Sequence, residues 1–226
     1  MSKYVYAGTK LVCVGKNYAA HSLEMGGTAA KRAEPLFFLK PSSSVVQAGA
    51  DGSRAVIVAP RGIGELHHEV ELGVVIGARA SRVTAGAARA HVRGYVLALD
   101  MTARDLQAAA KASGSPWTRG KCYDTFAPLS SRAADAARVP DPAALTLWLS
   151  VDGTQRQRGS TADMLHSVDE LIAHVSAVMT LEPGDVLLTG TPAGVGPVRA
   201  GQRIRAGIDA ADGSRLIEEE FDVVDG

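Results

Sequence analysis

The sequence predicts an α+β fold that is mainly β, with a few short helices. Short apolar runs rich in valine and leucine recur along the chain, and most of them are too short for a typical globular helix. Strong helix signals are confined to two segments, residues 103–112 and 168–179. Neither an internal repeat nor a disordered linker interrupts residues 1–226, so we expect one domain.

The strands are expected where apolar runs are bounded by turn-forming residues. They fall within residues 4–14, at 36–39, 55–59, 66–76, 91–100, 145–151 and 185–189, and around Ile204 and Phe221. The Asp152-Gly153 pair indicates a hairpin. Ser167 and Glu170 form a capping box at the start of the second helix. Residues 115–128 contain many turn formers, so we expect no helix there.

Composition excludes several classes of function. Lys plus Arg and Asp plus Glu both number 24, and this balance argues against a nucleic-acid surface or a polybasic membrane patch. No apolar stretch is long enough to span a bilayer, and the N-terminus lacks a signal-peptide layout. Cys13 and Cys122 are too few for a disulfide scaffold, so we expect reduced thiols in a cytoplasmic protein.

Three acidic residues at the ends of apolar runs form the most informative pattern. Glu69 and Glu71 are two residues apart in an expected strand, so their side chains share one face, and Asp100 closes another apolar run. Adjacent carboxylates repel each other and resist burial unless a cation compensates them. Three such groups suit Mg²⁺ or Mn²⁺ with positions left open for a substrate. The alternative is a solvated pair of acids at a sheet edge.

A histidine and a glutamate lie three residues apart on an expected short helix. Asn17 is expected to cap this helix, which ends before Gly26-Gly27. His21 and Glu24 then share one face, and the carboxylate would raise the imidazole pKa and fix its tautomer, as suits a base that takes a proton from water. The alternative is a surface pair. Residues from about 16 to 33 are expected to form a mobile lid.

The helix that follows the third acid carries more polar residues toward the same site. Thr102 is expected to cap it, with Asp105 completing a capping box. Arg104, Gln107 and Lys111 then fall on one face. An arginine fork and an amide near the acids could hold an anionic or carbonyl group. The alternative is an ordinary solvated helix face.

Two further polar residues lie in expected loops. Lys121 near a metal could neutralise a developing enolate, although most lysines are simply solvated. Thr191 lies in a glycine-rich loop, Gly190–Gly196, that fits neither nucleotide-binding fingerprint. The backbone N–H groups of this loop and the Thr191 hydroxyl could still bind a small carboxylate.

Together these residues resemble the fumarylacetoacetate hydrolase superfamily, in particular its small single-domain members. The similarity runs from Val12 to about Gly207 and rests on five motifs in family-like order. They are Val-Gly-Lys-Asn-Tyr-Ala-Ala-His21, His-His-Glu69-Val-Glu71-Leu, Ala-Leu-Asp100-Met-Thr-Ala-Arg104-Asp-Leu-Gln107, Gly-Lys121-Cys-Tyr-Asp-Thr-Phe-Ala-Pro and Leu-Thr-Gly-Thr191-Pro-Ala-Gly-Val-Gly. Two features depart from the pattern: Cys122 replaces a small residue, and the N-terminal domain of fumarylacetoacetate hydrolase has no counterpart, which argues against fumarylacetoacetate as the substrate.

The resemblance implies a mainly β fold of stacked sheets, a homodimer and a specific set of site residues. The implied ligands of Mg²⁺ or Mn²⁺ are Glu69, Glu71 and Asp100. The implied catalytic residues are His21 and Glu24, as a water-activating pair on the lid, and Lys121. The implied substrate contacts are Arg104, Gln107 and Thr191.

These assignments predict a metal-dependent hydrolase that cleaves a carbon–carbon bond in an acylpyruvate such as fumarylpyruvate, giving pyruvate and an organic acid. In this hypothesis His21 and Glu24 activate the attacking water, while Lys121 and the cation stabilise the pyruvate enolate. One alternative is oxaloacetate decarboxylation at the same site, and another is isomerisation or decarboxylation of dienoic dicarboxylates in aromatic catabolism. A non-catalytic scaffold with a structural cation is the alternative from another class. The expected partner of the enzyme is a small 2-oxo acid, with no nucleic acid or membrane involved.

Overall fold

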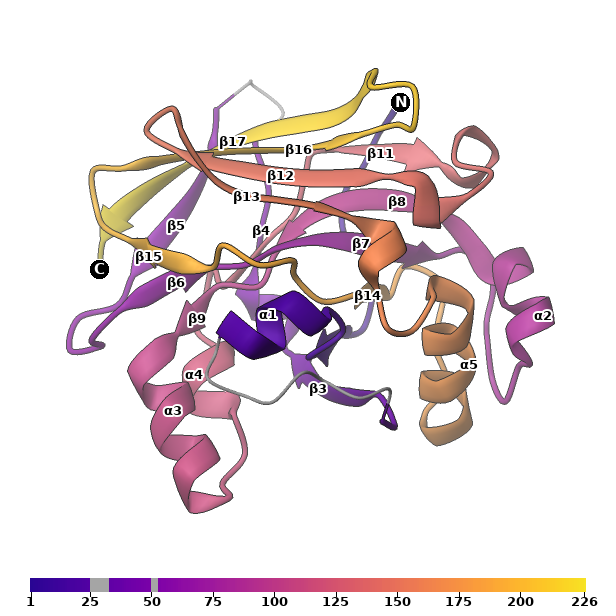
Figure 1. Cartoon of the computed structure of the whole chain (residues 1–226), viewed down its shortest axis with the longest axis horizontal. Helices are drawn as coiled ribbons and strands as arrows, with labels where there is room; N and C mark the ends of the chain where they lie inside the picture. The colour runs from indigo at the N-terminus through magenta and orange to yellow at the C-terminus, as the bar shows by residue number, and fades with distance from the viewer. Residues whose placement is uncertain (25–32, 50–52) are drawn as a thin grey trace.

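The computed structural model describes residues 1–24, 33–49 and 53–226 and shows stacked β-sheets with short helices along one side (Figure 1). The predicted mainly β, α+β fold is confirmed. Most of the expected lid segment, residues 25–32, lies outside the described residues.

The larger sheet is mixed and carries the predicted acids. Its strands, in spatial order, are β1 (Ser2–Lys3), β11 (Arg132–Asp135), β8 (Val92–Leu99), β7 (Val70–Ile76), β14 (Val186–Leu188), β2 (Leu11–Gly15) and β3 (Leu36–Lys40). β7 is antiparallel to both β8 and β14, and β14 is parallel to β2. The ends of β8, β14 and β2 therefore meet the start of β7 at the same end of the sheet.

A second sheet packs against the first and encloses the main hydrophobic core. Its strands, in spatial order, are β13 (Thr154–Ser160), β12 (Thr146–Val151), β16 (Arg203–Asp209), β17 (Arg215–Asp225) and β5 (Ala55–Ala59). The predicted hairpin at Asp152-Gly153 joins β12 to β13, and both turn residues have positive φ, as a tight hairpin turn requires. Alternate residues of β7, such as Leu72 and Val74, face this core together with Leu147 of β12.

The strand predicted over residues 66–76 is divided at Glu69. The part before it, β6 (Leu66–His68), pairs with β15 (Gly196–Val198) and β9 (Thr102–Ala103) in a small separate sheet. A further short pair is formed by β4 (Val45–Val46) and β10 (Ala127–Pro128). Glu69 therefore lies at a junction between sheets, where a side chain can point into the space between them.

The helices gather in two groups on the side of the larger sheet away from the second sheet (Figure 1). They are α1 (Ala19–Glu24), α2 (Ala85–Ala88), α3 (Arg104–Ser113), α4 (Thr118–Lys121) and α5 (Val168–Val178), with 3-10 turns at Ser42–Ser44, Arg89–His91, Ala136–Arg138, Pro142–Ala144 and Thr161–Asp163. The predicted capping box of α5 is confirmed, because the Ser167 side chain accepts from the Glu170 N–H and the Glu170 carboxylate accepts from the Ser167 N–H.

Two of the predicted helix caps are wrong. Thr102 belongs to β9, and its hydroxyl donates to the Asp100 carbonyl oxygen over 2.9 Å instead of capping α3. Pairing with β6 fixes the Thr102 backbone, so the helix begins two residues later at Arg104. The Asn17 side-chain NH₂ donates to the carbonyl oxygens of His166 and Thr189, and its oxygen accepts from the His166 N–H instead of capping α1. Asn17 thus joins the loop before α1 to segments distant in sequence. Long-range pairing outweighs the local capping preference at both positions.

Residues 115–128 do contain a helix, contrary to expectation. The single turn α4 forms where the carbonyl oxygen of Trp117 accepts hydrogen bonds from the N–H groups of Gly120 and Lys121. A turn of this length fits between the turn formers that exclude a longer helix. It also fixes the position of Lys121. Both cysteines are free, as predicted.

Candidate active site

The antiparallel pairing of β7 and β8 brings the three predicted acids together. Val70 pairs with Leu99, and the Asp100 N–H donates to the Glu69 carbonyl oxygen over 2.9 Å. Glu69 and Glu71 thus project from the start of one strand, next to Asp100 at the end of its neighbour. Oxygen atoms of the three carboxylates lie within 4.8 Å of one another, and none of the residues is more than 5% exposed.

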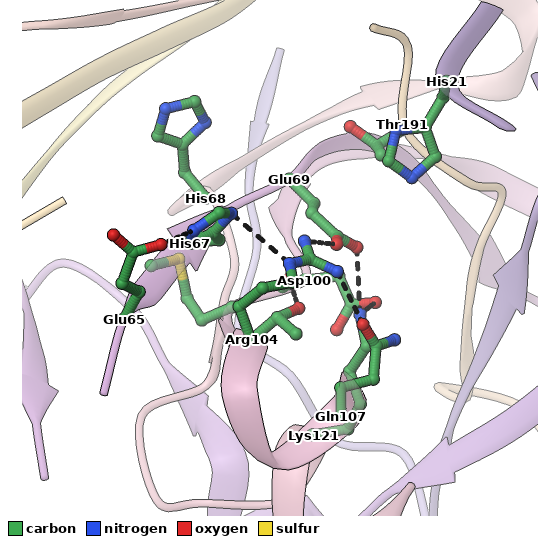
Figure 2. Close-up of polar contacts among 12 residues, drawn as sticks. His21, Glu65, His67, His68, Glu69, Asp100, Arg104, Gln107, Lys121 and Thr191 are labelled. Atoms are coloured by element: carbon green, nitrogen blue, oxygen red, sulfur yellow. Dashed lines mark hydrogen bonds and ion pairs between the residues drawn. The ribbon is translucent and has the colours of Figure 1, made fainter. Parts of the chain in front are cut away.

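Two lysines and an arginine surround two of these acids. Figure 2 shows Lys121 and Arg104 directed at Glu69 and Asp100. Lys121 Nζ lies 2.9 Å from Glu69 Oε2 and 2.5 Å from Asp100 Oδ2. Lys40 Nζ lies 2.8 Å from Asp100 Oδ1, and the Arg104 guanidinium forms an ion pair with Glu69. Burial opposes ionisation of Glu69, but Lys121 and Arg104 outweigh it and hold the pKa of this carboxyl well below its usual range.

Glu71 lies outside this network of cations. Its Oε2 accepts a hydrogen bond from the Gly190 N–H over 2.7 Å, and it forms no ion pair with any residue that the structure describes. Burial raises the pKa of Glu71 well above its usual value, and repulsion from Asp100 and Glu69 adds to the effect. The triad therefore has a local excess of negative charge at Glu71, which a bound proton or a cation would offset.

The triad fits a hard divalent cation. Its donor set consists of carboxylate oxygens, which Mg²⁺ and Mn²⁺ prefer. Asp100 Oδ1 is buried and has the Lys40 ammonium at 2.8 Å, so the charge of this oxygen is compensated by an ion pair. A buried Glu71 carboxylate that faces two other carboxylates and, within the described residues, has no cation of its own is expected of a group that ligates a cation.

His21 and Glu24 form the expected pair on α1. His21 is 9% exposed, and its Nδ1 lies 3.6 Å from Glu24 Oε2. The Gly194 N–H donates to both Glu24 oxygens, over 3.1 and 3.0 Å, so the carboxylate is held in place. The 3.6 Å contact is longer than a hydrogen bond, but the Glu24 charge favours a proton on Nδ1 and so leaves Nε2 as the nitrogen that can accept a proton.

The predicted rise in the pKa of His21 is wrong. Burial lowers the pKa of His21 from its usual 6.5, and this effect outweighs the opposing carboxylates of Glu69 and Glu24, while Arg104 lowers it further. The sequence reveals the neighbouring acid but not the depth of burial. His21 is consequently a neutral imidazole at neutral pH, which is the form that acts as a base.

α3 presents an arginine and an amide to the acids, as predicted. Arg104 Nη1 donates to Gln107 Oε1 over 2.6 Å, and Arg104 Nε donates to His67 Nδ1 over 3.3 Å. Because its oxygen is occupied by Arg104, the Gln107 side chain keeps its NH₂ group for a ligand, and no described residue accepts from that group.

One pocket collects these side chains. Figure 2 shows His21 and Thr191 on one side of Glu69, with Arg104, Gln107 and Lys121 on the other. Every predicted site residue except Glu24 lines the pocket. The lining residues are Val14, Gly15, Lys16, His21, Phe38, Glu69, Glu71, Asp100, Arg104, Gln107, Lys111, Trp117, Lys121 and Thr191.

Sequence analysis missed several residues of this region. Lys40 is 1% exposed and donates to the carbonyl oxygens of Met101 and Phe126 over 2.9 and 2.7 Å, beside Asp100. The sequence could have indicated Lys40, because this residue, like Asp100, is a single charged residue at the end of an apolar run. Lys16 and Trp117 gave no signal, because they lie outside regular strands and reach the pocket only through the tertiary fold.

Comparisons with known proteins cover nearly the whole chain. The family model described as the C-terminal region of fumarylacetoacetate (FAA) hydrolase matches residues 10–218. A mitochondrial oxaloacetate tautomerase of Oryza sativa subsp. japonica is 52% identical over 217 residues, which span 96% of this chain and 92% of that protein. A mitochondrial oxaloacetate decarboxylase of Dictyostelium discoideum is 45% identical over 224 residues, which span 99% of this chain and 98% of that protein.

These relatives leave location and assembly open. No helix in the described ranges is both long and apolar enough to cross a membrane. The two relatives are named as mitochondrial, so the predicted cytoplasmic location is not confirmed. The homodimer implied by the resemblance also stays a prediction.

A solved structure agrees with the sequence comparisons. The fumarylpyruvate hydrolase of Pseudomonas aeruginosa, in complex with Mn²⁺ and pyruvate, has a TM-score of 0.90 and 39% identity, covering 100% of this chain and 93% of that one. A divalent metal is thus supported by that complex and by the acid triad of this chain. The family model, the relatives and the structure confirm the resemblance: this chain belongs to the fumarylacetoacetate hydrolase family.

Proposed function

We propose that this protein is a divalent-metal-dependent oxaloacetate tautomerase, which interconverts the keto and enol forms of oxaloacetate. Oxaloacetate is named as the substrate of both relatives described above. The observation that carries the proposal is the buried His21 in the same pocket as the acid triad. Tautomerisation needs a neutral base that removes a proton beside a carbonyl, whereas decarboxylation does not.

Glu69, Glu71 and Asp100 would hold the cation. When bound, the cation supplies a Lewis acid that withdraws electrons from the 2-oxo group of the substrate. The free NH₂ group of Gln107 and the hydroxyl of Thr191 would donate hydrogen bonds to substrate oxygens and so orient the carbon that reacts.

His21 would act as the base in the proton transfer. His21 Nε2 takes a proton from C3 of the keto form, the C–H electron pair becomes the C2=C3 double bond, and negative charge passes to the C2 oxygen. Lys121 and Arg104 offset the developing charge, and Glu24 stabilises the imidazolium through Nδ1–H. The proton then returns to the oxygen, which gives the enol with no net change in atoms.

Decarboxylation of oxaloacetate is the second candidate, favoured by the Dictyostelium relative. Carbon dioxide leaves from C4, the C3–C4 electron pair becomes the C2=C3 double bond, and the resulting pyruvate enolate takes a proton at C3. The same cations would stabilise this enolate, but His21 is not needed to start the reaction.

Acylpyruvate hydrolysis, the main prediction from the sequence, is not confirmed. The comparisons favour the oxaloacetate alternative, because close relatives carry that substrate in their names. The Pseudomonas structure keeps hydrolysis of fumarylpyruvate as a third candidate. In that reaction His21 would activate water instead of removing a substrate proton.

Two lysines suit the pocket to a dicarboxylate. Lys16 and Lys111 both line it, and neither forms an ion pair with an acid among the described residues. Lys111 Nζ lies 5.2 Å from the centroid of the Trp117 ring. Burial lowers the pKa of Lys111, and repulsion from Arg104, Lys121 and Lys16 adds to this, so the lysine lacks a counter-ion that a distal carboxylate of the substrate would supply.

The first prediction concerns His21 and the type of reaction. With Mn²⁺, the protein should accelerate the decay of enol absorbance of oxaloacetate, and a chelator should abolish the effect. His21→Ala should lower tautomerisation by about 10²- to 10⁴-fold, the usual weight of a general base, and leave any pyruvate formation from oxaloacetate much less affected. His91→Ala, outside the pocket, is the matched control. Wild-type tautomerase activity in His21→Ala would exclude the assigned role.

The second prediction concerns pH. Since the pKa of His21 is lowered, the base stays neutral at and above pH 6.5 and is protonated only as the pH falls through the lowered value. A profile of kcat/KM against pH should therefore be flat above pH 6.5 and fall on the acid side of it. Three charged residues act on this imidazole, namely Glu24, Glu69 and Arg104. An acid limb with its midpoint above 6.5 would contradict the burial argument.

The third prediction concerns the distal carboxylate. Lys111→Met should raise KM for oxaloacetate by about 10- to 100-fold, the range of one hydrogen bond to a charged group. The inhibition constant of pyruvate, which has no second carboxylate, should stay unchanged, and Lys3→Met serves as the control. Equal weakening of both ligands would show that Lys111 acts on the site as a whole and does not read the distal group.

A further inference from the structure

Gln157 is a fully buried polar residue that has no place in the proposed chemistry. It lies in β13, where Leu149 of β12 pairs with Gln157 and Ser150 pairs with Gln155, so Arg156 is an extra residue in the ladder. Such a bulge changes the direction in which neighbouring side chains point. Gln155 and Arg156 are exposed, whereas Gln157 is turned into the protein.

The orientation of the Gln157 amide is fixed by its partners. The Val70 N–H can only donate, and it lies 3.0 Å from Gln157 Oε1, which identifies this atom as the oxygen. His68 Nδ1 lies 3.0 Å from the same oxygen and must donate to it as well. The NH₂ group therefore points the other way, where it donates to Thr191 Oγ1 over 2.8 Å and to the Pro192 carbonyl oxygen over 2.9 Å.

These bonds determine what the Thr191 hydroxyl can do. Its oxygen accepts from Gln157, so its hydrogen must point elsewhere. Among the described residues, the recorded acceptor is the Pro192 carbonyl oxygen at 3.5 Å, longer than a normal O–H···O bond and already bonded to Gln157. Thr191 lines the pocket, so its hydrogen is available to an oxygen atom bound there.

The loop that carries Thr191 rests directly on the bulge. A Cβ at Gly194 would lie 2.1 Å from the Arg156 carbonyl oxygen, and Gly194 has a φ of +95°. A Cβ at Gly159 would lie 2.5 Å from Pro192 Cβ. Neither Gly194 in the loop nor Gly159 in β13 has room for a side chain, so the two segments pack closely. This close packing keeps Thr191 and Pro192 within hydrogen-bond distance of Gln157.

We infer that Gln157 is a positioning residue that makes the Thr191 hydroxyl a hydrogen-bond donor to a carboxylate or carbonyl oxygen of the bound 2-oxo acid. The same amide bonds Val70, between Glu69 and Glu71, so one side chain sets the position of the hydroxyl relative to the acid triad. The inference rests on the proposed function, in which Thr191 contacts the substrate.

The test is Gln157→Glu, which keeps the shape of the side chain and reverses the bond to Thr191. A carboxylate still accepts from Val70 and His68 but cannot donate, so the Thr191 hydrogen turns toward residue 157 and away from the substrate. KM for oxaloacetate should rise about tenfold, the factor of one lost hydrogen bond, with a smaller change in kcat. Thr191→Val should match this effect, Thr191→Ser should restore the wild-type KM, and the double variant Gln157→Glu/Thr191→Val should be no worse than either single one.

Controls separate positioning from simple stability. Gln155→Glu makes the same change at an exposed position of β13 and should leave KM unchanged. The dissociation constant of pyruvate, measured calorimetrically with Mn²⁺ present, is a second readout that needs no turnover. If the wild type does not convert oxaloacetate but pyruvate binding falls in Gln157→Glu and Thr191→Val, the proposed function fails and the inference stands.

Three outcomes would overturn the inference. One is a wild-type KM and pyruvate affinity in Gln157→Glu, with only the melting temperature lowered. Another is a pair of single effects that multiply in the double variant, because independent effects exclude a shared hydrogen bond. The last is an unchanged KM and an unchanged pyruvate affinity in Thr191→Val. This outcome can be tested even if Gln157→Glu fails to fold, because residue 157 is unchanged in that variant.

Discussion

Three carboxylates buried side by side are the constraint on which the rest of this structure depends. Each would resist burial as an ion, and each raises the cost of ionising its neighbours. Lys121, Lys40 and Arg104 offset the charge of Glu69 and Asp100 through direct ion pairs. Glu71 receives only a backbone N–H in the described structure, and a cation bound to the triad would offset this remaining imbalance.

The sheet topology explains how residues far apart in the chain share this site. Antiparallel pairing of β7 with β8 sets Asp100 beside Glu69, and antiparallel pairing of β7 with β14 brings the Gly190–Gly196 loop to Glu71. The parallel pairing of β2 with β14 sends the chain from β2 toward α1 at the same end. His21, the three acids and the Gly190–Gly196 loop are therefore positioned by strand register, and the short helices add Arg104, Gln107 and Lys121.

Much of this could be predicted from local patterns, but contacts that depend on register could not. The alternation of polar and apolar residues located the acids, and the spacing of His21 and Glu24 was enough to pair them. The sign of the His21 pKa shift was wrong because burial depends on segments distant in sequence. Thr102 was assigned as a cap because its strand pairing with β6 cannot be seen in the local sequence. Gln157 was missed because it is a polar residue among exposed polar neighbours, and its burial depends on the pairing with Leu149 of β12. Lys40 could have been found by the argument used for Asp100.

The most direct test of the central claim is a calorimetric titration of chelator-treated protein with Mn²⁺, repeated in buffers of different ionisation enthalpy. One cation should bind, and the number of protons released on binding should rise as the pH is lowered, because the raised pKa of Glu71 favours its protonated form and the carboxyl must ionise to serve as a ligand. Glu71→Gln should weaken binding by more than about 100-fold, beyond the 10- to 100-fold effect typical of outer partners of a metal site, whereas Glu65→Gln at the surface should not. Equal Mn²⁺ affinity in the wild type and Glu71→Gln, or no binding to either, would contradict the account.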